Sequence, residues 1–283
     1  MNIAAELTAA EAKLRAAEIE NARLDAAVLL AFITGRDRTF LVAHPEYELT
    51  DSEHKAYTAA ILRRCTREPL QYITGVQEFY GIELLVSPDV LIPRPETELL
   101  VEEAIKHLKK VEQPAFCEIG SGSGCISVAV LKNVPDARAV AADISPAAAA
   151  MTAENARRAG VLGRLEVIVS DVFSAVGERR FDAVLSNPPY IGAGEVSTLQ
   201  PEVREHEPYI ALTDDADGSS IIRRLIGSSP EHLTAGGVIL IEIGFSQARA
   251  VEAMFAGGRW NDVVFIRDLQ GHERIAKACL ARV

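Results

Sequence analysis

The sequence predicts an α/β protein with an open, mostly parallel sheet, a small N-terminal helical domain and a β-hairpin linker between them. Three observations support this fold class. Apolar residues recur at helical spacing through residues 1–75, two short β-prone runs occur near residues 76–96, and strand-like and helix-like runs alternate within residues 97–283. We therefore expect three parts with these boundaries.

Residues 1–75 form the first predicted part. Leu14, Leu24 and Leu29 recur near helical spacing among Ala, Glu and Arg, which favour helices. Gly35 interrupts this pattern, and Thr50 begins a further helix because its hydroxyl can cap a helix N-terminus. These features predict a small helical bundle.

Residues 76–96 form the second predicted part. Two β-prone runs, 71–79 and 82–86, are separated by turn residues and predict a hairpin. Pro93 and Pro95 follow, and each restricts the residue before it to an extended conformation. We expect this stretch to be a stiff linker that leads into the next domain.

Residues 97–283 form the third predicted part, in which the alternation of elements predicts parallel strands joined by right-handed crossovers. The predicted strands are Ala115–Ile119, Ala137–Ala142, Leu165–Val169, Phe181–Ser186, Val238–Ile243 and Asp262–Ile266. The predicted helices between them are Cys125–Lys132, Pro146–Ala159, Ser219–Leu233 and Ser246–Phe255. In such a sheet, ligands bind at the carboxyl ends of the strands.

Composition excludes several classes of protein. The 29 Lys and Arg against 40 Asp and Glu give a net charge of −11, which disfavours stable nucleic-acid binding through phosphate neutralisation. No apolar run is long enough to cross a membrane, and the N-terminus lacks a signal peptide. The four cysteines are scattered and the six histidines lack metal-ligand spacing. We expect a cytoplasmic protein without a bound metal.

A glycine loop follows the first predicted strand of the third part. It reads Glu118, Ile119, Gly120, Ser121, Gly122, Ser123 and Gly124. The dinucleotide-binding fingerprint needs a small residue at Cys125, and a phosphate-binding P-loop needs a Lys that is absent. The glycines let a ligand approach the backbone closely. The other interpretation is a tight strand-to-helix turn.

Acidic residues on both sides of the loop favour a ligand. Glu118 would repel a pyrophosphate but suits a cationic group, and Asp143, at the end of the next strand, suits a ribose diol. A nucleoside with an ammonium group and no phosphate fits this pattern, which indicates S-adenosyl-L-methionine. After the third strand, Asp171 suits an adenine amino group and Val172 or Phe173 could cover the ring, although a turn alone also explains Asp171.

The tetrapeptide Asn187, Pro188, Pro189 and Tyr190 ends the fourth strand. The Asn187 side-chain oxygen and the Pro188 carbonyl form two acceptors that match the two hydrogens of a planar NH2 group. Tyr190 offers an aromatic face to the group that carries this NH2. The sequence thus indicates methyl transfer to an amide or exocyclic amine nitrogen, catalysed by orientation and charge stabilisation. A strand-ending turn is the structural alternative.

Together these motifs resemble the release factor glutamine methyltransferases, the PrmC/HemK family, over essentially the whole chain. The motifs that carry the resemblance are Glu78–Gly81, Leu91–Glu98 (LIPRPETE), Glu118–Gly124, Asp143, Ser170–Phe173, Ser186–Tyr190 and Pro201–Pro208 (PEVREHEP). The resemblance implies a Rossmann-like, class I S-adenosylmethionine-dependent methyltransferase fold. It also implies methylation of the side-chain nitrogen N5 of the glutamine in the GGQ motif of class I peptide chain release factors, which modulates translation termination.

The resemblance further implies roles for individual residues. Cofactor binding would involve Glu118, Gly120, Ser121, Gly122, Ser123, Gly124, Asp143, Asp171, Val172 and Asn187, with S-adenosyl-L-homocysteine as the product. Catalysis and glutamine binding would involve Asn187, Pro188, Pro189 and Tyr190. Many members have an aromatic residue at the position of Val172. We expect residues 1–75 to dock the release factor away from the reacting amide.

Two other functions are consistent with parts of this pattern. An adenine-N6 methyltransferase on DNA or RNA would present the same NH2 to the Asn187–Tyr190 segment, but it needs a basic surface. A noncatalytic S-adenosylmethionine-binding protein would have no need of that segment. Arg94 suits a contact to the partner or cofactor as well as a linker ion pair. His206 suits a surface loop better than the lining of a substrate cleft. We expect a solvated loop, and not a catalytic cluster, at Glu202, Arg204, Glu205 and Glu207.

Overall fold

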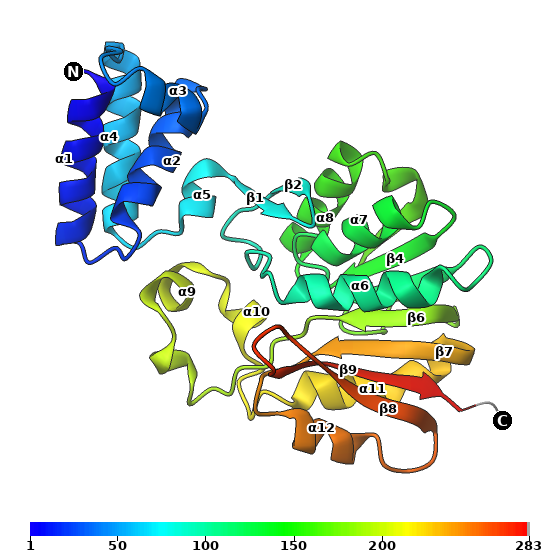
Figure 1. The fold of residues 1–283 in the computed structure, drawn as a ribbon. Helices are drawn as coiled ribbons and strands as arrows, with labels where there is room; N and C mark the ends of the chain where they lie inside the picture. Colours follow the sequence, from blue (N-terminus) through cyan, green and yellow to red (C-terminus); the bar gives the residue numbers. More distant parts are fainter. Residues whose placement is uncertain (282–283) are drawn as a thin grey trace. The chain divides into compact units, whose positions relative to one another are not determined.

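The computed structural model describes residues 1–281, which form two compact units. We call Met1–Val76 with Gln200–His206 the helical unit, and Gln77–Leu199 with the chain from Glu207 onward the sheet unit. Figure 1 shows the elements of both. None of the helices in residues 1–281 is both long enough and apolar enough to cross a membrane.

The helical unit is a bundle of short helices around an apolar core. Its helices are α1 (Ile3–Ala16), α2 (Ala22–Thr34), α3 (Arg38–Ala43), α4 (Asp51–Cys65), α5 (Leu70–Thr74) and α9 (Pro201–His206). Thr50 and Glu53 form a capping box at the start of α4. Gly35 ends α2 with a φ of +63°, a conformation that favours glycine. Leu29 and Tyr57 lie in the buried cluster between the helices. The expected N-terminal helical bundle is confirmed.

Helix α9 belongs to the helical unit although it lies far along the chain. Its Glu202 accepts hydrogen bonds from Arg64 at 3.2 Å and from Arg67 at 3.3 Å. Arg64 also donates to Asp25 at 2.8 Å and is almost fully buried. The expectation of a solvated loop is wrong at Glu202, because this carboxylate helps to neutralise a buried guanidinium.

The expected hairpin is present but shorter than predicted. Its strands are β1 (Val76–Phe79) and β2 (Ile82–Leu85). Residues 71–74, expected as strand, lie instead in α5, which begins after Pro69 and ends at Gly75 with a φ of +76°. Phe79 and Leu84 are fully buried in the core of the sheet unit. The structure therefore places most of residues 76–96 in that unit.

The sheet unit is built on seven strands in the order β5-β4-β3-β6-β7-β9-β8. They are β3 (Ala115–Ile119), β4 (Arg138–Asp143), β5 (Leu165–Val169), β6 (Phe181–Ser186), β7 (Leu233–Glu242), β8 (Trp260–Arg267) and β9 (Glu273–Leu280). Strands β3 to β7 pair in parallel, whereas β9 pairs antiparallel with both β7 and β8. The predicted, mostly parallel sheet is confirmed. Strand β9 was not predicted because its sequence alternates polar and apolar residues irregularly.

Helices cover both faces of the sheet (Figure 1). They are α6 (Thr97–Leu108), α7 (Cys125–Asn133) and α8 (Pro146–Arg158) on one face, and α11 (Ser220–His232) and α12 (Ala248–Met254) on the other. Shorter turns of helix are η1 (Leu162–Arg164), η2 (Val196–Thr198) and α10 (Tyr209–Leu212). The chain order reverses between the neighbouring strands β3 and β6, and this switch point is where open α/β sheets bind ligands.

Candidate active site

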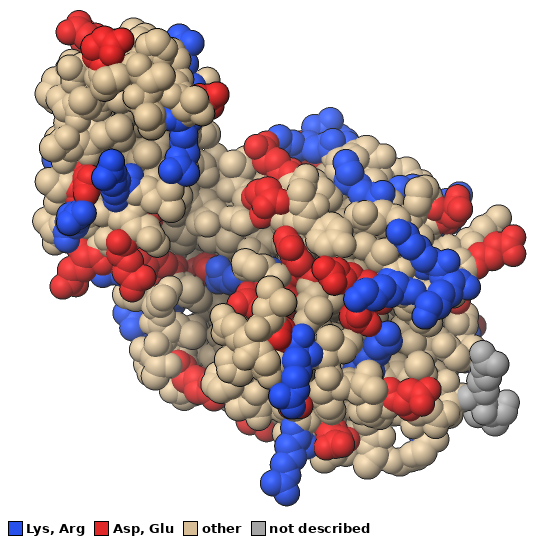
Figure 2. All heavy atoms as spheres, in the orientation of Figure 1, with Lys and Arg blue, Asp and Glu red and all other residues tan. Residues whose placement is uncertain are grey.

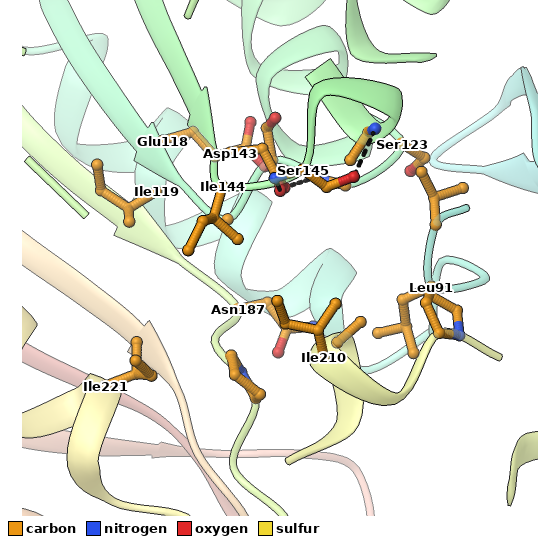
Figure 3. Close-up of a pocket in the computed structure, with 18 of the residues that line it drawn as sticks. Leu91, Glu118, Ile119, Ser123, Asp143, Ile144, Ser145, Asn187, Ile210 and Ile221 are labelled. Carbon is orange, nitrogen blue, oxygen red and sulfur yellow. Dashed lines mark hydrogen bonds between the residues drawn. The ribbon is translucent and has the colours of Figure 1, made fainter. Parts of the chain in front are cut away.

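A cavity of about 360 Å³ opens in the sheet unit at the carboxyl ends of β3, β4 and β6. Figure 3 shows Glu118, Asp143 and Ile144 on one side of it, and Asn187 and Ile210 on the other. The predicted site residues that line it are Glu118, Gly120, Ser121, Gly122, Ser123, Asp143, Asp171, Val172, Asn187 and Pro189. Gly124, Pro188 and Tyr190 are not among the lining residues. The structure thus brings most of the predicted site together.

The glycine loop has left-handed backbone at Gly120, Gly122 and Gly124, with φ values of +74°, +53° and +78°. A Cβ at Gly124 would lie 2.9 Å from the Thr152 side chain, which forbids a larger residue there. A Cβ at Gly122 would meet no atom within 4 Å, and this residue lines the cavity. Gly124 therefore serves loop packing, whereas the missing side chain at Gly122 leaves cavity space open.

Two buried residues of α8 hold this loop, and sequence analysis missed both. The Thr152 hydroxyl lies 2.9 Å from the Ser121 hydroxyl and donates to the Gly122 carbonyl at 3.0 Å. The Asn155 side chain donates to the Ser123 carbonyl and pairs with both backbone groups of Leu85 in the hairpin. The sequence feature that could have identified them is a polar residue on an otherwise apolar helix face, because a buried polar group needs hydrogen-bond partners.

Glu118 is fully buried beside the cavity. Its Oε2 accepts hydrogen bonds from the amide and the hydroxyl of Ser127. Within the described part of the chain, Oε1 has no hydrogen-bond partner. Burial raises the pKa of the Glu118 carboxyl to about 8. Because an unpaired buried carboxylate oxygen is costly, this site suits a cationic ligand group that donates hydrogen bonds.

Asp143 lies at the end of β4, close to the glycine loop. Its Oδ2 accepts from the Gly122 amide at 2.8 Å, and its Oδ1 accepts from the Ser145 amide at 2.9 Å. Burial raises the pKa of this carboxyl above its usual value. Each oxygen keeps a lone pair for a ligand hydroxyl. The next residue, Ile144, lines the cavity and is 50% exposed; it offers apolar surface that sequence analysis did not identify.

The residues after β5 contribute a third wall. Asp171 accepts a hydrogen bond from Arg224 at 2.8 Å, a partner that sequence analysis missed. Val172 lines the cavity with a φ of +51°, a strained conformation for a β-branched residue. Phe173 instead stacks on His232, with ring centroids 4.3 Å apart, and does not line the cavity. Of the two residues considered for covering an adenine ring, Val172 lines the cavity and Phe173 does not.

Asn187 directly follows β6 and is held by its side-chain nitrogen. Nδ2 donates to the Thr97 hydroxyl at 3.1 Å, and that hydroxyl donates to Glu242 at 2.7 Å. No donor in residues 1–281 reaches the Asn187 oxygen Oδ1. Tyr190 donates from its hydroxyl to Glu242 at 3.3 Å, and its ring packs against the cluster between the sheet and α11. Stacking of Tyr190 on a substrate amide stays a prediction.

The structure also shows the contacts of Arg94 and His206, the other two residues considered as site candidates. Arg94 lines the cavity and forms an ion pair with Glu207, so Glu207 is also not part of a solvated loop. His206 lies 3.1 Å from the Thr66 carbonyl within the helical unit. The described residues include no group of three or more His, Cys, Asp or Glu side chains placed to hold a metal ion.

The cavity combines a buried carboxyl with one unpaired oxygen, a second carboxylate beside the glycine loop, apolar walls and an open amide acceptor. Glu118 and Asp143 are negative or can become so, and no phosphate-binding cation accompanies them on the glycine loop. These features fit the ammonium, ribose and adenine groups of S-adenosylmethionine. Asn187 supplies the acceptor on the opposite side of the cavity (Figure 3).

Comparisons with known proteins identify the family and the fold of this chain. Residues 6–75 match the family described as PrmC N-terminal domain, and residues 96–201 match the family described as Methyltransferase small domain. A crystal structure of a methyltransferase from Pyrococcus furiosus has a TM-score of 0.54 at 16% identity and covers 80% of this chain and 98% of that chain. The expected class I methyltransferase fold is confirmed.

Proteins found by sequence comparison have a higher identity to this chain than that structure does. A release factor glutamine methyltransferase of Geobacter sulfurreducens is 41% identical over 257 residues, which cover 91% of this chain and 89% of the relative. One of Cereibacter sphaeroides is 41% identical over 280 residues, which cover 99% of each chain. With this similarity over nearly its whole length, the chain belongs to the release factor glutamine methyltransferase family.

Proposed function

We propose that this protein transfers a methyl group from S-adenosylmethionine to the side-chain nitrogen N5 of the glutamine in the GGQ motif of peptide chain release factors. This reaction would modulate translation termination in the cytoplasm. The observation that carries the proposal is the orientation of Asn187, whose Nδ2 is engaged by Thr97 while Oδ1 remains available at the cavity. Family membership supports the same substrate.

The cofactor would lie in the cavity along the strand ends. S-adenosylmethionine supplies a methyl group already activated on a sulfonium, so the transfer needs no Lewis acid. Glu118 Oε1 would accept from the ammonium group, and Asp143 would accept from the ribose hydroxyls. Ile144 and Val172 would cover the adenine, with Asp171 near its amino group.

The glutamine amide would be held by the residues after β6. Asn187 Oδ1 would accept one amide hydrogen and the Pro188 carbonyl the other. An amide lone pair is delocalised, and fixing both hydrogens orients the nitrogen toward the methyl group. The two acceptors also stabilise the positive charge that develops on nitrogen. Pro189 lines the same part of the cavity.

The helical unit would dock the release factor. A free glutamine offers the same amide, so a domain of 75 residues is unnecessary for the amide alone. A groove of about 910 Å³ runs over α1, α2 and α3, with apolar Leu24 and Val42 exposed in it and Arg23 and Arg38 beside them. Such a mixed surface suits a protein partner.

Charge disfavours the alternative of DNA or RNA adenine methylation. The net charge is −11. On the face drawn in Figure 2, Lys and Arg side chains are interspersed with Asp and Glu. A nucleic-acid enzyme needs basic surface to follow phosphates.

Mass spectrometry of a purified class I release factor, incubated with the protein and S-adenosylmethionine, tests the proposal. We expect a single added methyl group on the GGQ glutamine and none on a release factor in which Asn replaces that glutamine. Adenine-containing DNA and RNA serve as parallel substrates. Methylated adenine with an unmodified release factor would refute the proposal.

A further inference from the structure

Three side chains from separate parts of the chain form one hydrogen-bonded series beside the cavity. In the register of β6 and β7, Ser186 pairs with Ile241, so Asn187 and Glu242 follow at adjacent strand ends. Thr97, in the first turn of α6, lies between them and bonds to both, at 3.1 Å and 2.7 Å. Thr97 and Glu242 are each 1% exposed.

When Glu242 is ionised, each hydrogen bond in this series has one possible donor and one possible acceptor. A carboxylate only accepts hydrogen bonds, so the single hydroxyl hydrogen of Thr97 is directed to Glu242. Toward Asn187 the Thr97 oxygen can then only accept. Asn187 must therefore present Nδ2 to Thr97, which leaves its oxygen Oδ1 free for a ligand NH2.

We infer that Thr97 and Glu242 are positioning residues that keep the Asn187 carboxamide in the orientation that accepts from the substrate NH2. The inference rests on the proposed function, since it concerns the acceptor for the glutamine amide. A reversed carboxamide would present an NH2 to the NH2 of the substrate, and two donors facing each other cannot bond. Neither residue needs to touch the substrate.

The charge of Glu242 controls the orientation of the Asn187 carboxamide, because it decides whether Thr97 must donate to Glu242. Thr97 and Tyr190 donate to it, Arg274 favours its ionised form, and Glu96 opposes that form. Cys125 interacts electrostatically with Glu242 and is a neutral thiol, because burial raises its pKa. Burial raises the pKa of Glu242 to about 7.

Protonation of Glu242 would let donor and acceptor exchange roles along this series of hydrogen bonds. A carboxylic acid can donate to Thr97, whose hydroxyl hydrogen is then free to point to Asn187 Oδ1. The two carboxamide orientations become comparable in energy, and the productive one loses population. We therefore expect the methylation rate to rise with pH as Glu242 ionises around pH 7.

Three variants of the full-length protein test this account: Thr97→Val, Thr97→Ser and Glu242→Gln. Thr234→Val is the matched control, because Thr234 lies near the opposite end of β7 from Glu242. For each we would measure thermal unfolding, S-adenosylmethionine affinity by calorimetry, and kcat on the release factor across the pH range around 7. Calorimetry reports on the cavity independently of turnover.

Thr97→Val should lower kcat about tenfold or more, equivalent to roughly 1.4 kcal/mol, with unchanged cofactor affinity. Thr97→Ser should keep the wild-type rate and pH profile because it keeps the hydroxyl. Glu242→Gln should hold the rate near the low-pH wild-type value and abolish its rise with pH. Thr234→Val removes hydrogen bonds to the Phe181 carbonyl and to Asp182. It should lower only the unfolding temperature and keep the wild-type kcat, pH profile and cofactor affinity.

Wild-type kcat in Thr97→Val, or a retained pH rise in Glu242→Gln, would overturn the inference. A parallel loss of cofactor affinity and kcat would also overturn it, since that indicates general disruption of the cavity. Glu242→Gln preserves size, so its pH profile decides the matter even where Thr97→Val fails to fold. If the wild type binds the cofactor but does not methylate the release factor, the proposed function fails instead.

Discussion

Arg94 donates a hydrogen bond of 2.5 Å to Glu207, 113 positions later in the sequence. Glu207 also accepts from the Ile92 amide at 3.2 Å, and its side chain is 1% exposed. Both donors belong to the LIPRPETE motif, and Arg94 lines the cavity. Glu207 thus holds the LIPRPETE segment in place at the cavity and links it to the PEVREHEP segment, to which Glu207 itself belongs.

Glu207→Ala should therefore destabilise the protein. The change leaves the Ile92 amide and the partly buried Arg94 without their acceptor, and we expect a loss of about 1–3 kcal/mol in the free energy of unfolding. Chemical denaturation measures it. Glu205→Ala is the control, because Glu205 is 50% exposed and should change stability by less than about 0.5 kcal/mol. Equal effects of the two changes would contradict the structural role of Glu207.

Gly122→Val should abolish cofactor binding by filling the ligand space. Gly160→Val is a matched control, since Gly160 also has a positive φ, +74°, and open space around it, but lies outside the cavity lining. Both changes carry a backbone strain of about 1–2 kcal/mol. Only Gly122→Val should remove S-adenosylmethionine binding in calorimetry; similar affinities in the two variants would exclude close approach of the ligand to Gly122.

Glu118 should make the stability of the ligand-free protein depend on pH. Its pKa rises from 4.5 to about 8 on folding, so folding takes up a proton between these pH values. Its contribution to the free energy of unfolding is complete below about pH 4.5 and declines as the pH approaches 8. The pKa difference is about 3.5 units. At about 1.4 kcal/mol per pKa unit, the full decline is on the order of 5 kcal/mol.

The comparison of wild type with Glu118→Gln isolates this effect, because Gln does not titrate and the other acidic groups are shared. Denaturation curves from about pH 5 to about pH 9 should show wild-type stability falling relative to the variant. Parallel pH dependence in the two proteins would show that Glu118 does not hold its proton in the folded state.

The groove of the helical unit should contribute to partner recognition. Val42→Asp places a charge at a residue that is 82% exposed in the groove. It should raise KM for the intact release factor about tenfold, equivalent to roughly 1.4 kcal/mol, and leave turnover of a short GGQ peptide unchanged. Leu62→Asp is the control, because Leu62 is 56% exposed on α4 outside the groove. Identical KM values for both variants would locate docking elsewhere.

The sequence predicted the elements whose signals are local. Short, nearly continuous apolar runs located the strands β3 to β6 almost to the residue, and Thr50 and Gly35 marked helix boundaries. Residues 71–74 looked like strand because their β-prone side chains outweighed the flanking boundary signals. Strand β9 lacks a clear period because charged and apolar residues occur on both of its faces, and both faces contribute to the core.

The sequence anticipated which residues line the cavity where those residues lie at strand ends. Glu118, Asp143 and Asn187 each lie at or directly after such an end, so topology alone brings them together. The partners Thr97 and Glu242 are 145 positions apart, and no pattern in either segment indicates their contact. Their role depends on sheet register and helix placement, which only the folded structure provides.

The central claim is that Asn187 accepts a hydrogen of the substrate amide, and turnover of Asn187→Ala tests it most directly. Cofactor affinity should survive, because Glu118 and Asp143 lie on other strands. The rate of methyl transfer to the GGQ glutamine, followed by mass spectrometry, should fall about 10²–10³-fold or more at every pH.

Asn187→Asp is the companion variant, since it keeps an acceptor of nearly the same shape. We expect partial activity that rises with pH as the introduced carboxylate ionises. The decisive measurement is the single-turnover rate of Asn187→Ala with saturating S-adenosylmethionine. The account predicts normal cofactor binding with a rate reduced at least about 100-fold, whereas a near wild-type rate would contradict it.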